Sequence, residues 1–461
     1  MARLGRLRGR LVTTAAAAAC VAAGLLSCAG CSSGAGSAAL TRGSSPSQSL
    51  PTRALPSPGC SDQTAGRPRL SGVRVAMTAV RDGPFGMALT SDGRWGFVAV
   101  GAGVEVLRFD RSLVPVPVRT IPLPGSPGGE AITPDGRYLL VADGAGAAVL
   151  SVARAEAGTP GAVLGTLSAA AAARAGHGPA TPRQGQAAAL LETAVEVAVS
   201  PDGRFAFVSL EYASQVAVFN LARALADGFG AADDVGRIPL GESVAGLAVS
   251  PDGRWLYATS EVSSPAQHLA GPAGPTALSA RQAAGCPGTY PGEGPGTLTV
   301  ISLGRAETDP AGSVTATVDA GFQPVRVVTS AGGALVWVTA RASDDLLCFS
   351  AARLAASPAR ALLAVVRVGA APVGLAAVRG GSLIVVADSD RFGSRGETPD
   401  LDVVSVADAL TGRGAAVLGR VPSGLFPRDM AAPPGGDGPL LVSNNASNQV
   451  EAVDLAGLPR G

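Results

Sequence analysis

The chain has 461 residues, of which 47% are hydrophobic and 15% charged, so it is long enough to bury a large core. Its 36 basic residues nearly balance 35 acidic ones, which argues against a basic surface for nucleic acid and against an acidic tail. The 62 Gly and 35 Pro residues indicate many tight turns together with flexible flanks.

Residues 1–27 have the pattern of an export signal. Four Arg residues occur within the first ten positions, and an apolar run from Leu11 to Leu26 follows. The end of this run resembles a bacterial lipoprotein signal, in which a small residue precedes the Cys that receives the lipid. We interpret Cys28 as the lipidated residue, with Cys31 as one alternative and secretion without a lipid as another. The expected location is therefore the extracytoplasmic side of the cell membrane, with the lipid as the only membrane anchor.

Residues 28–69 are rich in Ser, Gly, Pro and Thr and contain few large apolar side chains. Such a segment cannot bury enough apolar surface to offset the entropy lost when a chain becomes ordered. We therefore predict a flexible tether over residues 28–69, which leads to a folded domain over residues 70–461.

Four nearly identical hexapeptides mark the first part of the folded domain. They share an Asp-Gly-Arg core and begin at Thr90, Thr133, Ser200 and Ser250. The Asp side chain bonds its own backbone and Gly accepts a positive φ, so each hexapeptide is typical of a tight turn. Short runs rich in β-branched and aromatic residues flank the turns, and each unit is therefore predicted to be a β-hairpin.

Three weaker copies of the turn begin at Ser330, Val378 and Pro433 and bring the predicted hairpins to seven. A third strand follows each hairpin, a fourth follows six of them, and an extra strand at Val73–Ala76 precedes the first. A repeat of about forty residues is typical of a propeller. We predict an all-β fold, a seven-bladed β-propeller with four-stranded blades, in which the N-terminal strand completes the last blade.

The second strand of each hairpin carries a recurring tetrapeptide, for example Tyr257-Ala-Thr-Ser260 and Leu441-Val-Ser-Asn444. With the Ser-Pro-Asp-Gly turn, these units resemble the YVTN-type β-propeller repeats that are shared with lactonase-like propeller proteins. No unit matches the Tyr-Val-Thr-Asn tetrapeptide in full, so the resemblance rests on the whole unit and covers the folded domain. It implies the propeller fold and suggests lactone hydrolysis as one activity, although a fold alone does not define a function.

Three long insertions, at residues 168–191, 260–295 and 388–401, interrupt the units. Propeller connectivity places all three on the face opposite the Pro-Asp-Gly turns. We therefore expect one elaborated face, which is the candidate functional face, and one plain face, with neutral drift in tolerant loops as the alternative.

Few residues suggest a metal or a cofactor. His177 and His268 are the two histidines, both in insertions, and no His/Cys cluster indicates zinc or copper. The acidic stretch from Asp388 to Asp402 could offer oxygen ligands to Ca²⁺ but lacks a known loop spacing, so we interpret it as an exposed polar loop. We expect no metal and no cofactor.

The cysteines of the mature chain suggest one covalent link. Cys60 lies at the end of the tether and Cys286 in the second insertion, and in an oxidising compartment the two could form a disulfide. Cys348 lies in a predicted core strand and is interpreted as a buried small hydrophobic residue.

An alignment of the seven innermost strands identifies one informative column. It contains Gly86, Gly129, Glu196, Gly246, Arg326, Gly374 and Asp429. Gly is expected where strands crowd the axis, so the three charged members, with Glu130 and Arg428 beside the column, are the candidate ligand-binding residues. The alternative is a set of ion pairs that satisfy one another in a wet channel.

Two functions remain open. The first is a surface binding or scaffold module, acting as a monomer on an envelope protein, a glycan or a small ligand, and not on nucleic acid. The second is a lactone hydrolase, in which Glu196, Glu130 or Asp429 would act as general base and Arg326 would stabilise an oxyanion. The absence of a recognised catalytic motif favours the binding module.

Overall fold

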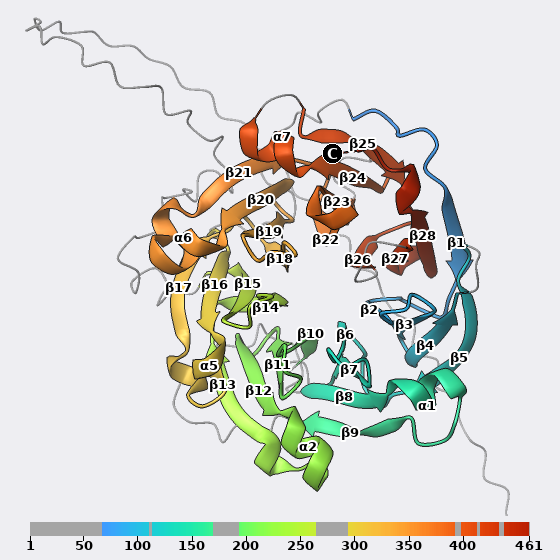
Figure 1. Ribbon diagram of the computed structural model, residues 1–461, viewed down its shortest axis with the longest axis vertical. Coiled ribbons are helices and arrows are strands. Elements are labelled where there is room, and N and C mark those ends of the chain that lie inside the picture. Colours follow the sequence, from blue (N-terminus) through green and yellow to red (C-terminus); the bar gives the residue numbers. More distant parts are fainter. Residues whose placement is uncertain are drawn as a thin grey trace, which may run out of the picture. The chain divides into compact units, whose positions relative to one another are not determined.

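The computed structural model describes residues 67–109, 113–168, 193–263, 294–391, 398–412, 415–432 and 438–460. Within these residues the chain forms seven four-stranded antiparallel sheets that surround a central axis (Figure 1). The predicted seven-bladed β-propeller is thus confirmed. The signal predicted for residues 1–27 lies outside the described residues, and so does the tether predicted for residues 28–69, except for its last three residues.

In every blade the first strand is innermost and the fourth is outermost. Blade 1 contains β2 (Met87–Leu89), β3 (Trp95–Val100), β4 (Gly103–Arg108) and β5 (Val116–Pro122). Blade 2 contains β6 (Glu130–Ile132), β7 (Tyr138–Asp143), β8 (Gly146–Ser151) and β9 (Val163–Ser168). Blade 3 contains β10 (Ala194–Val199), β11 (Phe205–Leu210), β12 (Gln215–Asn220) and β13 (Asp234–Pro239). Blade 4 contains β14 (Glu242–Val249), β15 (Trp255–Val262), β16 (Thr297–Ser302) and β17 (Val314–Asp319). Blade 5 contains β18 (Pro324–Thr329), β19 (Leu335–Ala340), β20 (Asp345–Ser350) and β21 (Leu362–Arg367). Blade 6 contains β22 (Pro372–Val378), β23 (Leu383–Asp388), β24 (Asp400–Ser405) and β25 (Val417–Pro422).

Blade 7 joins the two ends of the described chain. Its inner strands are β26 (Pro427–Ala431), β27 (Pro439–Asn444) and β28 (Gln449–Asp454), and its outer strand is β1 (Val75–Ala79). Strand β1 is antiparallel to β28, with Val75 opposite Val453. Just before β1, the backbone N–H of Leu70 donates to the carbonyl of Arg420 in blade 6 at 2.9 Å. Contacts with the propeller therefore begin slightly before residue 70.

The apolar core lies between the blades. Seven clusters of buried residues each join two adjacent blades, so the sheets pack face to face around the ring. Trp337, Tyr257, Phe97 and Phe207 are among the largest fully buried side chains, and all four lie on second strands. The aromatic and β-branched residues that predicted the hairpins are thus the ones that fill these interfaces.

The Asp-Gly turns have the local chemistry expected of them. In the first turn the Thr90 hydroxyl donates to the Asp92 carboxylate at 2.6 Å, and the Arg94 N–H donates to the same carboxylate oxygen at 3.0 Å. Gly93 has a φ of 65°, in the left-handed region that favours Gly. The same pattern recurs in the turns that begin at Thr133, Ser200 and Ser250.

The face that carries these turns was expected to be plain, and this expectation is wrong. The connection between the third and fourth strands carries a short helix in each of blades 2 to 6. These helices are α1 (Val152–Ala157), α2 (Leu221–Asp227), α5 (Leu303–Ala306), α6 (Ala351–Ala356) and α7 (Val406–Thr411). Further 3-10 turns on this face are η2 (Ala231–Asp233), η3 (Pro310–Gly312), η4 (Pro358–Arg360), η5 (Arg379–Gly381) and η7 (Leu455–Gly457), whereas η6 (Asn445–Ser447) joins β27 to β28 on the opposite face. The helices form because buried residues such as Val152 and Leu221 cover the ends of the inter-blade cores. Among the described residues, no helix has the length and hydropathy needed to cross a membrane.

Candidate functional site

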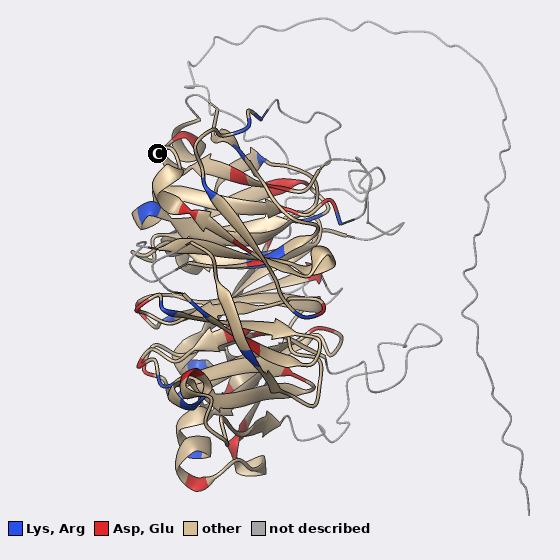
Figure 2. Cartoon of the chain, turned by 90° about the vertical axis from the view of Figure 1, so that its right-hand side faces the viewer, with Lys and Arg blue, Asp and Glu red and all other residues tan. Residues whose placement is uncertain are grey.

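Three of the predicted site residues meet at the axis. Arg326 on β18 forms an ion pair with Glu196 on β10 and a second one, at 3.0 Å, with Asp429 on β26. Glu196 and Arg326 are each 9% exposed, so both charges are buried. Figure 2 shows such acidic and basic positions within the blades and not only in the turns. The structure therefore contains the mutually satisfied ion pairs that the sequence left as an alternative.

Glycines around the axis make this geometry possible. Arg326 extends from blade 5 past blades 4 and 6, where the same column position holds Gly246 and Gly374, to reach blades 3 and 7. Elsewhere the strands approach so closely that a Cβ on Gly86 would lie 2.4 Å from the carbonyl oxygen of Gly128. A Cβ on Gly246 would likewise lie 2.4 Å from the carbonyl oxygen of Val325, so close backbone approach explains glycine at these column positions.

Hydroxyl groups on the second strands hold the charged column in place. The backbone N–H groups of Glu196, Arg326 and Asp429 donate to the hydroxyls of Ser209, Thr339 and Ser443 at 2.9, 3.1 and 3.1 Å. Each hydroxyl in turn donates to a backbone carbonyl of the next blade. These hydroxyls occupy the third position of the recurring tetrapeptide, so one sequence motif sets the position of the charged residues and joins adjacent blades.

Glu130, at the start of β6, differs from the other predicted residues. Its side chain is buried, and neither carboxylate oxygen makes a well-formed hydrogen bond within the described part of the chain. Burial raises the pKa of the Glu130 carboxyl well above its usual value, and the nearby Asp429 carboxylate raises it further, against a small opposing effect of the Ala88 N–H. This environment favours the protonated form of the Glu130 carboxyl.

Arg428, on β26, faces aromatic rings. Its guanidinium carbon lies 3.5 Å from the centroid of the Phe85 ring and 5.4 Å from that of Phe426. Burial lowers the pKa of Arg428 to about 9, and the neighbouring positive charges of Arg326, Arg391 and Arg341 act in the same direction. The site around Arg428 therefore has a positive potential.

A second set of charged residues, which sequence analysis missed, lies at the ends of the second strands, on the face opposite the Asp-Gly turns. We call this set the mouth, and it contains Glu211, Glu261, Arg341 and Arg391. Arg341 binds the Glu261 carboxylate at 2.8 Å and the Gln323 side-chain oxygen at 2.9 Å. Burial, followed by the charge of Glu261, raises the pKa of Glu211.

The sequence did contain a signal for most of the mouth. Glu211, Glu261 and Arg341 each come directly after the recurring tetrapeptide, at a position held by Gly101 and Gly144 in blades 1 and 2. An alignment of this second column would have placed the three charges together. Arg391 lies in the connection between β23 and β24 and has no counterpart in that column.

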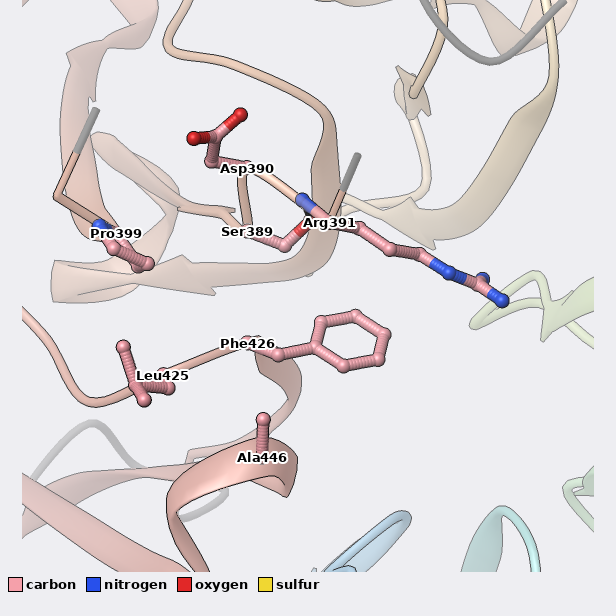
Figure 3. A pocket seen from close by; sticks show the side chains of 7 residues that line it. All are labelled: Ser389, Asp390, Arg391, Pro399, Leu425, Phe426 and Ala446. Atoms are coloured by element: carbon pink, nitrogen blue, oxygen red, sulfur yellow. Dashed lines mark hydrogen bonds between the residues drawn. The ribbon is translucent and has the colours of Figure 1, made fainter. Parts of the chain in front are cut away.

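A groove opens beside the mouth, between blades 6 and 7 (Figure 3). It has a volume of about 310 Å³ and is lined by Ser389, Asp390, Arg391, Pro399, Leu425, Phe426 and Ala446. The Arg391 guanidinium carbon lies 5.5 Å from the centroid of the Phe426 ring, which is a cation–π contact. In Figure 3 the Asp390 carboxylate points away from Arg391 and from Phe426.

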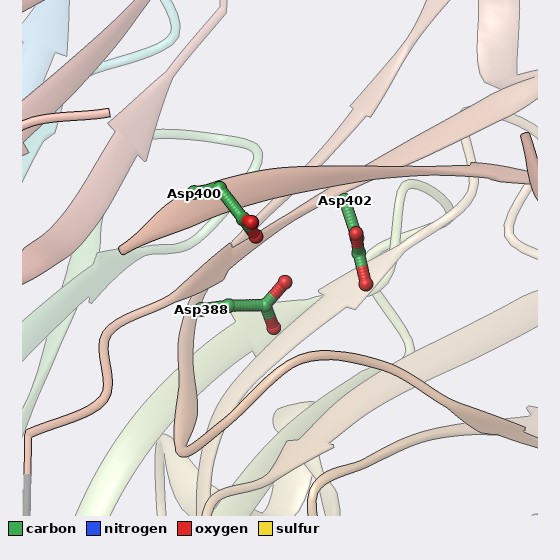
Figure 4. A group of neighbouring side chains, drawn as sticks. All are labelled: Asp388, Asp400 and Asp402. Carbon is green, nitrogen blue, oxygen red and sulfur yellow. The ribbon is translucent and has the colours of Figure 1, made fainter. Parts of the chain in front are cut away.

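The acidic stretch of blade 6 was interpreted as an exposed polar loop, and that interpretation is wrong for three of its aspartates. Asp388, Asp400 and Asp402 are 3%, 2% and 0% exposed, and one oxygen from each lies within 4.8 Å of the others (Figure 4). The Arg67 guanidinium lies among them, at 3.1, 3.1 and 2.8 Å from the three carboxylates. A charge from the N-terminal segment, far away in sequence, is what allows these strand-end carboxylates to be buried.

The protonation of this cluster follows from its burial. Desolvation and the adjacent carboxylates raise the pKa of Asp388 well above its usual value, and burial raises the pKa of Asp402 to about 6 despite the charge of Arg67. Burial alone would lower the pKa of Arg67, but the three carboxylates raise it overall. Because the Arg67 guanidinium lies among the three carboxylates, where a cation would otherwise bind, the cluster is an ion pair network.

Several predicted features lie outside the described residues. They are the lipidation candidates Cys28 and Cys31, the proposed disulfide partners Cys60 and Cys286, and the histidines His177 and His268. The strand ends that flank the three long insertions are described and lie on the face of the mouth. Cys348 is buried, as predicted, and burial raises the pKa of its thiol to about 12.

The fold and the site define this protein as a seven-bladed β-propeller with charged side chains converging on its axis. No family model and no curated protein matches the sequence. Among solved structures, the chain is similar to hydrazine synthase of Kuenenia stuttgartiensis, with a TM-score of 0.54 and 16% identity, over 84% of this chain and 98% of that one. At this identity the similarity is evidence for the fold alone. The resemblance to YVTN-type repeats stays a prediction.

Proposed function

We propose that this protein is a binding module that holds a polar ligand at the mouth of the propeller channel. The observation that carries the proposal is the convergence of charged and aromatic side chains from blades 1, 3, 4, 5, 6 and 7 on one end of the axis. Convergent polar groups beside an apolar groove are typical of ligand sites. The axial ion pairs beneath the mouth would form its rigid floor.

The same proposal places the module outside the cytoplasmic membrane, held by a lipid on Cys28, with Cys31 as the alternative. The ligand would then be an envelope protein, a glycan or a small molecule of the extracellular space. Metabolic labelling of the protein with a radioactive fatty acid tests the anchor. Incorporation that is lost in Cys28→Ser and kept in Cys31→Ser supports it, and no incorporation in the unaltered chain contradicts it.

A thermal-shift screen of the purified full chain tests the binding site. Sugar lactones, oligosaccharides, small carboxylates and divalent cations are the probes, because a ligand that binds the native state raises the melting temperature by mass action. The screen is repeated on Glu211→Gln, at the mouth, and on Glu156→Gln, on the opposite face, where burial also raises the carboxyl pKa. A melting shift that is reduced by Glu211→Gln but not by Glu156→Gln supports the proposal. A shift that neither substitution changes contradicts a binding site at the mouth.

Lactone hydrolysis is the second candidate, and one observation favours it. Glu130 combines a buried carboxyl, a raised pKa and no well-formed hydrogen bond within the described residues, which suits a general acid or base. Glu196 and Asp429 are already paired with Arg326, so Glu130 is the better candidate for that role. Acid release from a sugar lactone, followed in a pH-stat, tests this function. Activity that is lost in Glu130→Gln supports it, and no activity in the unaltered chain excludes it for that substrate.

A further inference from the structure

Two arginines at the wall of the mouth share one aromatic ring. The guanidinium carbons of Arg391 and Arg428 lie 5.5 and 5.4 Å from the centroid of the Phe426 ring. Neither guanidinium has a carboxylate within 4.0 Å among the described residues, whereas Arg326 and Arg341 both do. The boundary between the groove and the mouth thus holds two positive charges that no acidic side chain of the described residues contacts directly.

The surroundings limit which anion can bind there. Glu211 and Glu261 are close enough to influence the pKa of Arg391, so the positive potential is partly offset. These carboxylates, together with Asp390 in the lining of the groove, weaken the attraction that the guanidinium groups exert on any anion, so charge alone does not define the ligand. The planar guanidinium group also matches a carboxylate through two parallel hydrogen bonds.

The groove supplies the other half of a ligand site. Pro399, Leu425, Phe426 and Ala446 give it an apolar lining, and Leu425 is 56% exposed, which is high for a large apolar side chain. Its volume of about 310 Å³ is at the lower end of the range of small-molecule pockets. An apolar group placed there would cover Leu425 while an attached carboxylate met Arg391.

We propose that the groove between blades 6 and 7 binds a small carboxylate with an apolar body, its carboxylate on Arg391 and its body against Leu425 and Phe426, while Arg428 behind the Phe426 ring adds to the positive potential. This inference rests on the proposed binding function and names the class of ligand. The site is separate from the axial ion pairs, which lie between Glu196, Arg326 and Asp429.

Isothermal titration of the purified full chain tests the proposal. The probes are phenylbutyrate and isocaproate, the neutral amides of both acids, and inorganic phosphate. Both acids should bind, and the amides should bind at least about tenfold more weakly because they lose the charge-assisted hydrogen bonds. Phosphate should bind more weakly than either acid.

Three variants assign the binding to the groove. Arg391→Gln should weaken phenylbutyrate binding by about tenfold or more. The affinity of Arg391→Lys for phenylbutyrate should lie between that of Arg391→Gln and that of the unaltered chain. Arg254→Gln is the matched control, because Arg254 also lies over an aromatic ring, that of Trp255 at 5.7 Å, but on the opposite face. The affinity of Arg254→Gln for phenylbutyrate should be unchanged. Because Arg391 is exposed, its replacement should leave the fold intact.

The proposal is overturned if neither acid binds at millimolar concentration, if the amides or phosphate bind as tightly, or if Arg391→Gln has no effect. Failure here is distinguishable from failure of the binding function. If another probe still gives a melting shift that depends on Glu211, the module binds a ligand at its mouth and only the carboxylate assignment is wrong.

Discussion

Arg326 contacts two carboxylates that come from different blades, and this single residue shows how charge is tolerated on the axis. The side chains of Arg326, Glu196 and Asp429 are 10%, 12% and 15% exposed. A buried pair contributes little net stability compared with apolar residues, but removal of one partner leaves an uncompensated charge. The same reasoning applies to Arg67 and its three carboxylates.

Replacement of Arg326 should therefore be strongly destabilising. Arg326→Met leaves Glu196 and Asp429 without their counter-ion and should lower the free energy of unfolding by about 3–5 kcal/mol, measured by denaturant titration. The control combines Arg326→Met with Glu196→Gln and Asp429→Asn, which removes the stranded charges and should recover much of the loss. A single variant as stable as the unaltered chain would show that the axial ion pairs do not hold the blades.

Glu130 predicts a dependence of stability on pH. Its native pKa lies well above the unfolded value of 4.5, so above pH 4.5 the unfolded chain releases this proton while the native chain retains it. The stabilising effect is complete below 4.5 and is lost as the pH rises through the native pKa. The Gln side chain of Glu130→Gln does not titrate. The difference in free energy of unfolding, variant minus unaltered chain, should therefore increase as the pH rises from 4.5 through the native pKa of Glu130. A difference that stays constant or decreases would contradict the raised pKa.

The sequence alone predicted some of the individual charged residues of the site. Glu196, Arg326 and Asp429 were found because they break a column of glycines in strands that share one register. The mouth was missed because its residues follow the second strands, which were not aligned beyond the tetrapeptide. Arg67 was not predictable, since 321 residues separate it from Asp388 and no local pattern relates them.

At the scale of the strand, the recurring tetrapeptide has a physical explanation. Its third residue is Ser209, Thr259, Thr339 or Ser443 in four blades, and each hydroxyl links its own blade to the next. Blades 1, 2 and 6 have Ala99, Ala142 and Ala387 at the same position. The motif was visible in the sequence, but its role as an inter-blade hydrogen bond required the structure.

Thr259 offers a test of this role. Thr259→Val keeps the shape of the buried side chain but removes the bond to the Val325 carbonyl at 2.8 Å and leaves the Gly246 N–H without its acceptor. The melting temperature should fall, and the free energy of unfolding should drop by about 1–3 kcal/mol. Thr259→Ser retains the hydroxyl and should lose less than Thr259→Val. Equal losses in the two variants would show that packing, and not the hydrogen bond, is responsible.

The alternation of residues that predicted the strands did not predict the short helices between the third and fourth strands. Each of α1, α2, α6 and α7 is preceded by a Ser or Asn whose side chain accepts a bond from a backbone N–H of the first turn. These capping residues and the Ala-rich stretches after them were readable in the sequence. They were overlooked because the segments are only six or seven residues long and follow directly on the third strands.

At the scale of the whole molecule, the ring is closed by β1, which gives blade 7 its outer strand. The segment before it contacts blade 6 through Arg67 and through the bond from Leu70 to Arg420. Blades 6 and 7 are thus joined by a segment from the other end of the sequence. Repetition made the number of blades predictable, because every unit repeats the same local turn and strand signals.

Removal of this segment should open the ring. A chain that begins at Val80 lacks β1 and Arg67 and exposes the edge of β28, so it should aggregate or unfold at a markedly lower temperature. A chain that begins at Arg67 keeps both elements and is the control. Differential scanning calorimetry of the two chains measures the effect. If the shorter chain melted like the control, the N-terminal strand would not be required for closure.

Hydrogen exchange tests whether a ligand binds at the mouth. Exchange is measured on the full chain with and without the probe that gives the largest melting shift. Added protection is predicted in the segments that contain Phe85, Glu211, Glu261, Arg341, Arg391 and Arg428. Protection confined to the Pro-Asp-Gly turns and the helices of the opposite face would contradict a binding site at the mouth.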